Sequence, residues 1–266
     1  DVTEVKSGPA LQQADRSTVS AVMRRDAAKA ADYARRHGVA RWYHDADALI
    51  ADPEVDAVYV ATPPSSHEDL TLRALAAGKP VLVEKPMAMS VAACDRMIDA
   101  AQTAGQSLSV AYYRRALPRF EKLRSLIGDG AIGTPRVAWI THLTPRETRP
   151  DVEWKIDPSI GGGGMFFDTQ GHTIDWLQSV FGTASSVGGL TARQAGEYPA
   201  EDVVGFTGLF GAVAVSGNAK TYNVPPGAVW RPTSAIRSSD HSSGFLAGAK
   251  PSRNQASAEP SHAVSV

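Results

Sequence analysis

Between residues 18 and 111, short apolar runs alternate with amphipathic stretches, and this alternation constrains the fold more than any other feature. We expect buried strands at residues 19–23, 58–61, 81–83 and 108–111, and helices at residues 27–37, 68–77 and 91–104. Gly38 and Gly105 directly follow two of these helices, as glycine often does at a helix C-terminus. The pattern is typical of an α/β domain with a doubly wound parallel sheet, which binds ligands at the carboxyl ends of its strands.

After Arg114 the pattern changes, which indicates a second domain. The expected helices are at residues 117–127 and 165–180, and the expected strands are at 136–143, 203–210 and 212–216. Strands that cluster with few helices favour a partial α+β domain with an open, mostly antiparallel sheet. From residue 219 the sequence is rich in Ser, Pro, Arg and Ala and can bury little surface. We therefore divide the chain into a parallel-sheet domain at 1–115, a partial second domain at 116–218 and a disordered or non-native tail at 219–266.

Composition restricts the class of partner. The 266 residues carry 27 basic and 28 acidic side chains, a formal net charge of −1, which argues against binding nucleic acid by neutralising phosphates. Cys94 is the only cysteine, which excludes an internal disulfide and favours a reducing compartment such as the cytoplasm. No apolar run approaches the roughly 20 residues that cross a bilayer. We expect a cytoplasmic protein with a small-molecule partner, and an export signal upstream of Asp1 remains open.

The element Glu84-Lys85-Pro86 comes directly after the apolar run 81–83, at the end of a predicted strand. A lysine at this place can donate to a substrate oxygen, or hold a hydroxyl whose proton is leaving. Pro86 biases Lys85 towards an extended backbone, although a solvated loop lysine is the plain alternative. The aromatic candidates for lining a pocket are Tyr112, Tyr113 and Trp154, although aromatic residues in a chain of this size more often belong to a core.

Asp168 and His172 lie four residues apart on a predicted helix and therefore share one face. A carboxylate beside an imidazole raises the pKa of the imidazole and orients its tautomer, which suits a proton acceptor. Four glycines at 161–164 precede the pair, and we expect them to let the backbone approach a ligand without a Cβ in the way. A helix-terminal acid with a structural histidine is the alternative. A metal site would need ligands beyond His142, so we expect no metal.

A phosphate-binding loop is the element that such a domain should carry after its first strand. The one literal G-x-G-x-x-G match, at residues 128–133, follows a predicted helix, so we interpret it as an ordinary loop. Residues 1–15 look helical with no strand before them, and we expect the first strand and the glycine loop to lie upstream of Asp1. Because a missing central strand leaves unpaired backbone groups on both neighbours, we expect the chain as written to fold poorly and to be inactive.

Three segments occur in an order and at a spacing that resemble one family. They are ATPPSSH at 61–67, VLVEKPMA at 81–88 and GGGGMFFDTQGHTID at 161–175. Over about residues 1–218, the chain resembles the glucose-fructose oxidoreductase/inositol dehydrogenase/MocA (Gfo/Idh/MocA) family of NAD(P)-dependent oxidoreductases. The resemblance implies a Rossmann domain that binds a dinucleotide, lacking its first strand here, followed by a substrate and oligomerisation domain.

By this resemblance Lys85, Asp168 and His172 are the catalytic residues. His172 exchanges the substrate hydroxyl proton, Asp168 tunes His172, and Lys85 polarises the same oxygen while hydride passes to or from the nicotinamide. The residues implied to frame the nicotinamide and its ribose are Thr62, Pro63, His67, Glu84 and Lys85. The implied substrate is a sugar, polyol or related carbonyl or hydroxyl compound. A non-catalytic dinucleotide-binding sensor of the same fold is the alternative.

The end of the predicted strand 19–23 bears on the choice of cofactor. An acidic residue at this point binds the adenosine ribose hydroxyls, whereas an arginine accommodates a 2′-phosphate. The chain has Arg24 and Arg25 where the acid is expected, which favours NADP over NAD, although Asp26 would serve if the strand ended later. An exposed face on the second-domain sheet would also favour a homo-oligomer.

Overall fold

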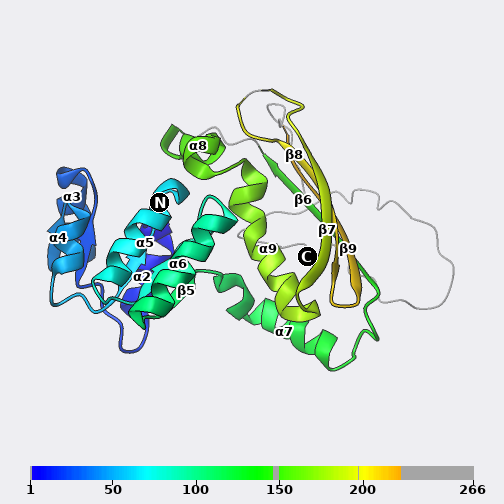
Figure 1. The fold of residues 1–266 in the computed structure, drawn as a ribbon, viewed down its shortest axis with the longest axis horizontal. Coiled ribbons are helices and arrows are strands. Elements are labelled where there is room, and N and C mark those ends of the chain that lie inside the picture. The colour runs from blue at the N-terminus through cyan, green and yellow to red at the C-terminus, as the bar shows by residue number, and fades with distance from the viewer. Residues whose placement is uncertain (1, 146–149, 197, 223–266) are drawn as a thin grey trace, which may run out of the picture.

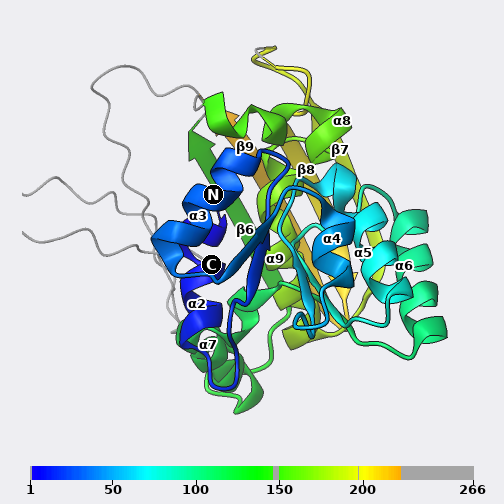
Figure 2. The same ribbon diagram turned by 90° about the vertical axis from the view of Figure 1, so that its left-hand side faces the viewer.

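The computed structural model describes residues 2–145, 150–196 and 198–222. Figure 1 shows two units: one of short strands with helices, and one built on a longer sheet. Helix α9 (Met165–Phe181) lies between them and packs on the sheet of the second unit. Figure 2 views the molecule from the first unit, with the second unit's sheet behind it. The expected fold class, a parallel-sheet domain followed by an α+β domain, is therefore confirmed.

The first unit contains the predicted parallel strands. Its strands are β1 (Ala21–Met23), β2 (Arg41–Tyr43), β3 (Val58–Val60), β4 (Val81–Val83) and β5 (Leu108–Val110). Its helices are α1 (Val2–Val5), α2 (Ser7–Gln13), α3 (Ala27–His37), α4 (Ala46–Ala51), the 3-10 helix η1 (Pro64–Ser66), α5 (His67–Ala76) and α6 (Val91–Ala104). All strand pairs of the unit are parallel, but they form two sheets, β1-β2 and β3-β4-β5. The described residues place no strand in the middle, between β1 and β3, the position of the expected first strand.

Helices α3 and α6 begin and end where the sequence predicts because both carry caps. The side chain of Asp26 caps α3 and that of Ser90 caps α6, each accepting a backbone N–H of the first turn. Gly38 and Gly105 end the two helices in the left-handed region, with φ of 65° and 63°. Strand β2 is not predicted from the sequence because Arg41–Tyr43 is not an apolar run, and α4 is not predicted because six residues are too few to show a helical period.

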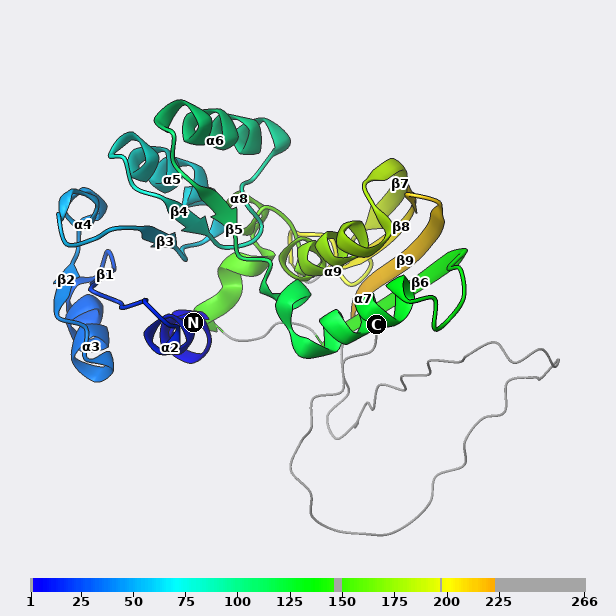
Figure 3. The same ribbon diagram turned by 90° about the horizontal axis from the view of Figure 1, so that it is seen from below.

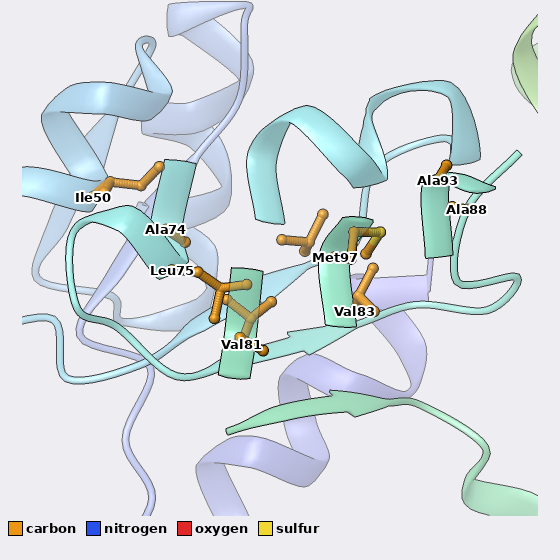
Figure 4. Close-up of a cluster of buried hydrophobic side chains, with 10 residues drawn as sticks. Ile50, Ala74, Leu75, Val81, Val83, Ala88, Ala93 and Met97 are labelled. Carbon is orange, nitrogen blue, oxygen red and sulfur yellow. The ribbon is translucent and has the colours of Figure 1, made fainter. Parts of the chain in front are cut away.

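The core of the first unit lies between the sheet β3-β4-β5 and the helices α5 and α6. Figure 4 shows apolar side chains from these elements meeting in one cluster. Leu75 on α5 is 1 % exposed, and Met97 on α6 and Val83 on β4 are fully buried. Full burial of such a side chain stabilises the fold by about 1.5–3 kcal/mol. This packing anchors the end of β4, and Lys85 follows directly.

The second unit has a four-stranded sheet in the order β6-β9-β8-β7. Its strands are β6 (Val137–Pro145), β7 (Ala184–Ala192), β8 (Val203–Phe210) and β9 (Val213–Tyr222). The helices before and around it are the 3-10 helix η2 (Tyr113–Ala116), α7 (Pro118–Gly128), the 3-10 helix η3 (Pro150–Ile156), α8 (Pro158–Gly161) and α9. Strand β8 is antiparallel to β7 and to β9, whereas β6 is parallel to β9. The sheet is therefore mixed, with the antiparallel pairings in the majority.

The described helices cover one face of this sheet and not the other. Helices α7 and α9 pack on the inner face, and Figure 3 shows no described helix on the outer face. Trp176 and Leu177 of α9 are 4 % and 1 % exposed in the resulting core. The large apolar side chains that the strand register places on the outer face are exposed, and they are Val137, Trp139, Leu190 and Leu209.

The predicted boundary of the tail is wrong by four residues. Strand β9 continues to Tyr222, so residues 219–222 belong to the sheet. Residues 223–266, the remainder of the predicted tail, lie outside the described residues. Gly128 is the last residue of α7, and residues 129–133 belong to the loop between α7 and β6, so the glycine match lies at a helix end and in a loop, as predicted. None of the described helices has the length and apolar character that crossing a bilayer requires.

Candidate active site

The candidate active site lies where the loop after β4 meets helix α9. The ammonium group of Lys85 donates to the backbone oxygen of Asp168 at 2.6 Å and to its Oδ1 at 2.8 Å. The two side chains are mostly buried, with 17 % and 13 % exposed. The structure thus brings together two residues that the resemblance names, although they come from different units and lie 83 residues apart in the chain.

Asp168 is held by two lysines. Lys155, in η3, donates to Oδ2 at 3.1 Å while Lys85 occupies Oδ1. Burial by itself would raise the pKa of Asp168, but the two ammonium groups outweigh burial and hold the pKa below its usual value. Asp168 acts on His172 only through its charge, which is the weakest of the influences on that pKa. Asp168 thus influences His172 in the expected direction, but this influence is outweighed, and the carboxylate is bonded by the two lysines.

His172 lies one turn further along α9 and is 3 % exposed. The rings of Tyr112 and Tyr113 meet the imidazole edge-on, with centroids 5.9 and 4.8 Å away. The Nδ1 atom is buried and has no hydrogen-bond partner in the part of the chain that the structure describes. A buried polar atom without a partner costs roughly 1–3 kcal/mol. A ligand group that bonds Nδ1 would remove this cost.

The pKa of His172 is lowered from 6.5 to about 3, opposite to the direction expected from the sequence. Burial is the largest cause, followed by the positive charges of Arg114, Lys85 and Lys6. The Asp168 carboxylate raises the pKa but is outweighed. His172 is therefore neutral near pH 7, which is the form that can accept a proton.

The glycine run before α9 packs against the chain itself, which corrects the expectation that it opens space for a ligand. A Cβ at Gly161 would lie 2.6 Å from the backbone oxygen of Trp154, and a Cβ at Gly164 would overlap the backbone oxygen of Glu201. The Gly164 N–H also donates to Oε1 of Glu201 at 2.8 Å. Gly161 thus lets η3 approach α8, and Gly164 lets the segment before β8 approach the start of α9. The approach of η3 to α8 sets the position of Lys155.

Glu84 is buried and bonded within the chain. The hydroxyl of Tyr59 donates to Oε1 of Glu84 at 2.6 Å, and the backbone N–H of Lys85 donates to Oε2 at 3.1 Å. Burial, and then the bond to the Glu84 carboxylate, raise the pKa of Tyr59. These bonds fix the backbone from which the Lys85 side chain extends.

His67 joins the two loops that follow β3 and β4. Its Nδ1 lies 2.9 Å from the backbone oxygen of Pro86, and its Nε2 lies 2.8 Å from that of Thr62. The side chain is completely buried. His67 therefore positions Thr62 and Pro86 and presents no ring surface to a ligand in this structure. Thr62 and its neighbour Pro63 are half-buried at the end of β3.

Arg24 and Arg25 directly follow β1, as predicted. The guanidinium of Arg24 lies over the ring of Tyr33 at 5.6 Å, and Arg25 is exposed. Asp26, the acidic alternative, uses its carboxylate to cap α3. These residues border the β1-β2 sheet, whereas Lys85 follows a strand of the other parallel sheet.

The polar groups of the site fit a ligand that carries a hydroxyl or carbonyl oxygen, since they include one ammonium group and one unbonded imidazole nitrogen. They adjoin the carboxyl ends of β3 and β4, where this fold binds its ligands. In the described ranges no glycine-rich turn joins a strand to a helix N-terminus, which is the element that binds a pyrophosphate. The described residues therefore suit the nicotinamide end of a dinucleotide but not its pyrophosphate. Nor do these ranges contain three or more His, Cys, Asp or Glu side chains grouped to hold a metal ion.

Three cationic residues of the site escape prediction from the sequence. They are Lys6, Arg114 and Lys155. Lys155 reaches Asp168 only because η3 folds back on α8, and Lys6 of the N-terminal segment lies 6.0 Å over the ring of Tyr113. No motif marks such contacts. The sequence does name Tyr112 and Tyr113 as candidates for lining a pocket, and both lie beside His172.

Comparison with known proteins identifies the family. Residues 3–112 match an oxidoreductase family with an NAD-binding Rossmann fold, and residues 120–228 match the C-terminal domain of the Gfo/Idh/MocA proteins. The chain belongs to the Gfo/Idh/MocA oxidoreductase family. The resemblance found in the sequence is thereby confirmed.

Relatives of this family member include oxidoreductase P35 of Formosa agariphila, which is 41 % identical over 70 % of this chain and 60 % of the relative. The 1,5-anhydro-D-fructose reductase of Ensifer adhaerens is 34 % identical over 61 % of this chain and 48 % of the relative. The chain thus spans about half to three fifths of the length of these relatives.

Solved structures of the family superpose on the fold. Levoglucosan dehydrogenase in complex with NADH and levoglucosan gives a TM-score of 0.71 at 27 % identity, covering 76 % of this chain and 58 % of that one. The aldose-aldose oxidoreductase of Caulobacter crescentus, complexed with glycerol, gives 0.73 at 28 % identity, covering 83 % and 68 %.

Replacement of His172 by Gln should make the free energy of unfolding less sensitive to acid. Between about pH 6 and the folded pKa of about 3, the unfolded chain takes up a proton at this histidine and the folded chain does not, so stability falls as the pH falls. The slope from this one group reaches about 1.4 kcal/mol per pH unit. Urea unfolding from pH 7 down to about 4 measures it, with the exposed His44→Gln as control. Equal slopes in wild type and His172→Gln would contradict the lowered pKa.

Proposed function

We propose that the protein is an NAD(P)-dependent dehydrogenase or reductase that acts on a CH–OH group or the matching carbonyl of a sugar, polyol or related compound. The observation that supports this most directly is the convergence of Lys85, Asp168 and His172 beside the carboxyl ends of β3 and β4. The printed names of several relatives, among them 1,5-anhydro-D-fructose reductase and levoglucosan dehydrogenase, favour a sugar-like substrate.

In this proposal the substrate oxygen lies between the ammonium group of Lys85 and the imidazole of His172. Lys85 uses two N–H groups on Asp168, which leaves the third to donate to the substrate oxygen. Neutral His172 accepts the hydroxyl proton during oxidation and returns it during reduction. The bound nicotinamide supplies the hydride chemistry. Asp168 holds the ammonium group of Lys85 in place, a role that the lowered pKa of the Asp168 carboxyl supports.

In an intact version that carries the first strand and the glycine loop, replacement of Lys85 by Met, or of His172 by Gln, should lower turnover by at least about 100-fold, because each removes a group that handles the substrate oxygen or its proton. Binding of the reduced cofactor should change little, since the adenosine end lies elsewhere. Steady-state kinetics and cofactor fluorescence titration measure the two effects, with the exposed Lys122→Met as matched control.

Full turnover in both site variants would contradict the assignment of these residues. A wild-type protein that binds cofactor but turns over no sugar or polyol would favour the alternative function, a dinucleotide-binding sensor of the same fold.

We infer a preference for NADP from Arg24 and Arg25 at the end of β1, together with the use of Asp26 as a helix cap. NADPH should bind at least about tenfold more tightly than NADH, about 1.4 kcal/mol. The variant Arg25→Asp should remove most of this difference, because it replaces the cation beside the 2′-phosphate by an anion. Fluorescence titration with NADPH and with NADH measures the two dissociation constants, with the exposed Arg124→Asp as control. Tighter binding of NADH by the wild type contradicts the preference.

We also propose a homo-oligomer formed through the outer face of the second-unit sheet. Trp139 is 78 % exposed there, and Val137, Leu190 and Leu209 share the face. Contiguous exposed apolar side chains of this size mark association sites. Trp139→Lys should convert the oligomer to a monomer with little change in Tm, whereas Val187→Lys, at an exposed position on the opposite face, should not. Light scattering after gel filtration measures the mass, and a monomeric wild type contradicts the proposal.

A further inference from the structure

Lys155 belongs to the charge cluster of the site, yet the proposed reaction does not use it. Its ammonium group lies 3.1 Å from Oδ2 of Asp168, on the oxygen that Lys85 leaves free. The side chain is 23 % exposed, and its ammonium group also lies 5.7 Å over the ring of Trp154. Each oxygen of the Asp168 carboxylate thus has its own lysine.

The backbone that carries Lys155 is firmly placed. A Cβ at Gly161 would lie 3.2 Å from the Cα of Lys155 as well as 2.6 Å from the oxygen of Trp154, so η3 and α8 touch at the backbone. Asp157 caps α8 by accepting the Ser159 N–H at 2.9 Å. Because η3 and α8 are fixed on both sides of the connection between them, the fold itself holds Lys155 beside Asp168.

A carboxylate with one partner can rotate about its side-chain bonds, whereas one held at both oxygens cannot. Lys85 forms its two bonds to Asp168 at the backbone oxygen and at Oδ1. The direction of the third N–H of Lys85 therefore depends on where Oδ1 lies, and Lys155 fixes Oδ1 by holding Oδ2. Lys155 also adds a second positive charge that keeps a largely buried carboxylate ionised.

We propose that Lys155 is a positioning residue, which orients the Asp168 carboxylate and through it aims the ammonium group of Lys85 at the substrate oxygen. This rests on the proposed function of Lys85. The charged and titratable groups that face Asp168 are Lys85 from the loop after β4, Lys155 from η3 and His172 from α9 itself. His172 stays neutral over the working pH range, so replacement of Lys155 by a neutral residue removes one of the two positive charges on Asp168 and leaves Lys85 as the other.

The test compares Lys155→Met, Lys155→Gln and Lys155→Arg with the exposed control Lys122→Met. Lys155→Met should lower kcat at least about tenfold while KM changes less than about threefold, since the substrate contacts themselves remain. The pKa of Asp168 should rise when one cation is lost, so activity on the acid side should begin to fall at a higher pH. Lys155→Arg should keep most of the wild-type kcat. Lys155→Gln should keep less of it, because the amide bonds Oδ2 without a charge.

A readout without turnover separates this proposal from the proposed function. Carbon NMR of the aspartate carboxyls follows the titration of Asp168 directly, with Asp168→Asn to assign the signal. An upward shift of this titration in Lys155→Met, and none in Lys122→Met, supports the positioning role whatever the substrate is. An unchanged titration and an unchanged pH profile overturn it. If Lys85→Met retains full activity while the Asp168 titration still shifts, the proposed function fails and the contact with Lys155 stands.

Discussion

The bond between Lys85 and Asp168 is the interaction on which the site depends, because it joins the loop after β4 to α9 across the two units. Each partner is held by its own unit. Glu84 and the β4 packing fix the backbone of Lys85, while the second-unit sheet supports α9 through Trp176 and Leu177. Removal of one member of a largely buried ion pair leaves an uncompensated charge, which is strongly unfavourable. The geometry of the site is therefore a property of both units.

Much of the fold follows from local sequence. Helices α3 and α6 carry an acceptor side chain before the first turn and a glycine after the last, and short apolar runs mark β3, β4 and β5. Strand β7 escapes prediction because Ser and Gly dominate it and most of its residues are exposed, so no alternation of apolar side chains is visible. The end of β9 escapes for a similar reason: its later residues are small or polar and gain their order from pairing with β6 and β8.

The sequence predicts which residues form the site better than it predicts their pKa values. Spacing and resemblance find Lys85, Asp168 and His172, because each lies in a recognisable segment. The sign of the His172 pKa shift is missed, since burial and the charges of Lys6 and Arg114 come from elements that meet only in the folded chain. The sequence alone also gives a wrong expectation for the four glycines at 161–164. Four glycines in sequence suggest room for a ligand, whereas the space is taken by the backbones of Trp154 and Glu201.

The position of β9 has a consequence for the order of assembly. Within the described residues β6 pairs only with β9, which lies about seventy residues further along the chain, and β9 sits between β6 and β8. During synthesis the inner surface against which α9 rests is incomplete until Val213 and Val215 of β9 have left the ribosome, and pairings of such long sequence separation form late. The helix that bears Asp168 and His172 therefore gains its support last, after the first unit has had time to fold around Lys85.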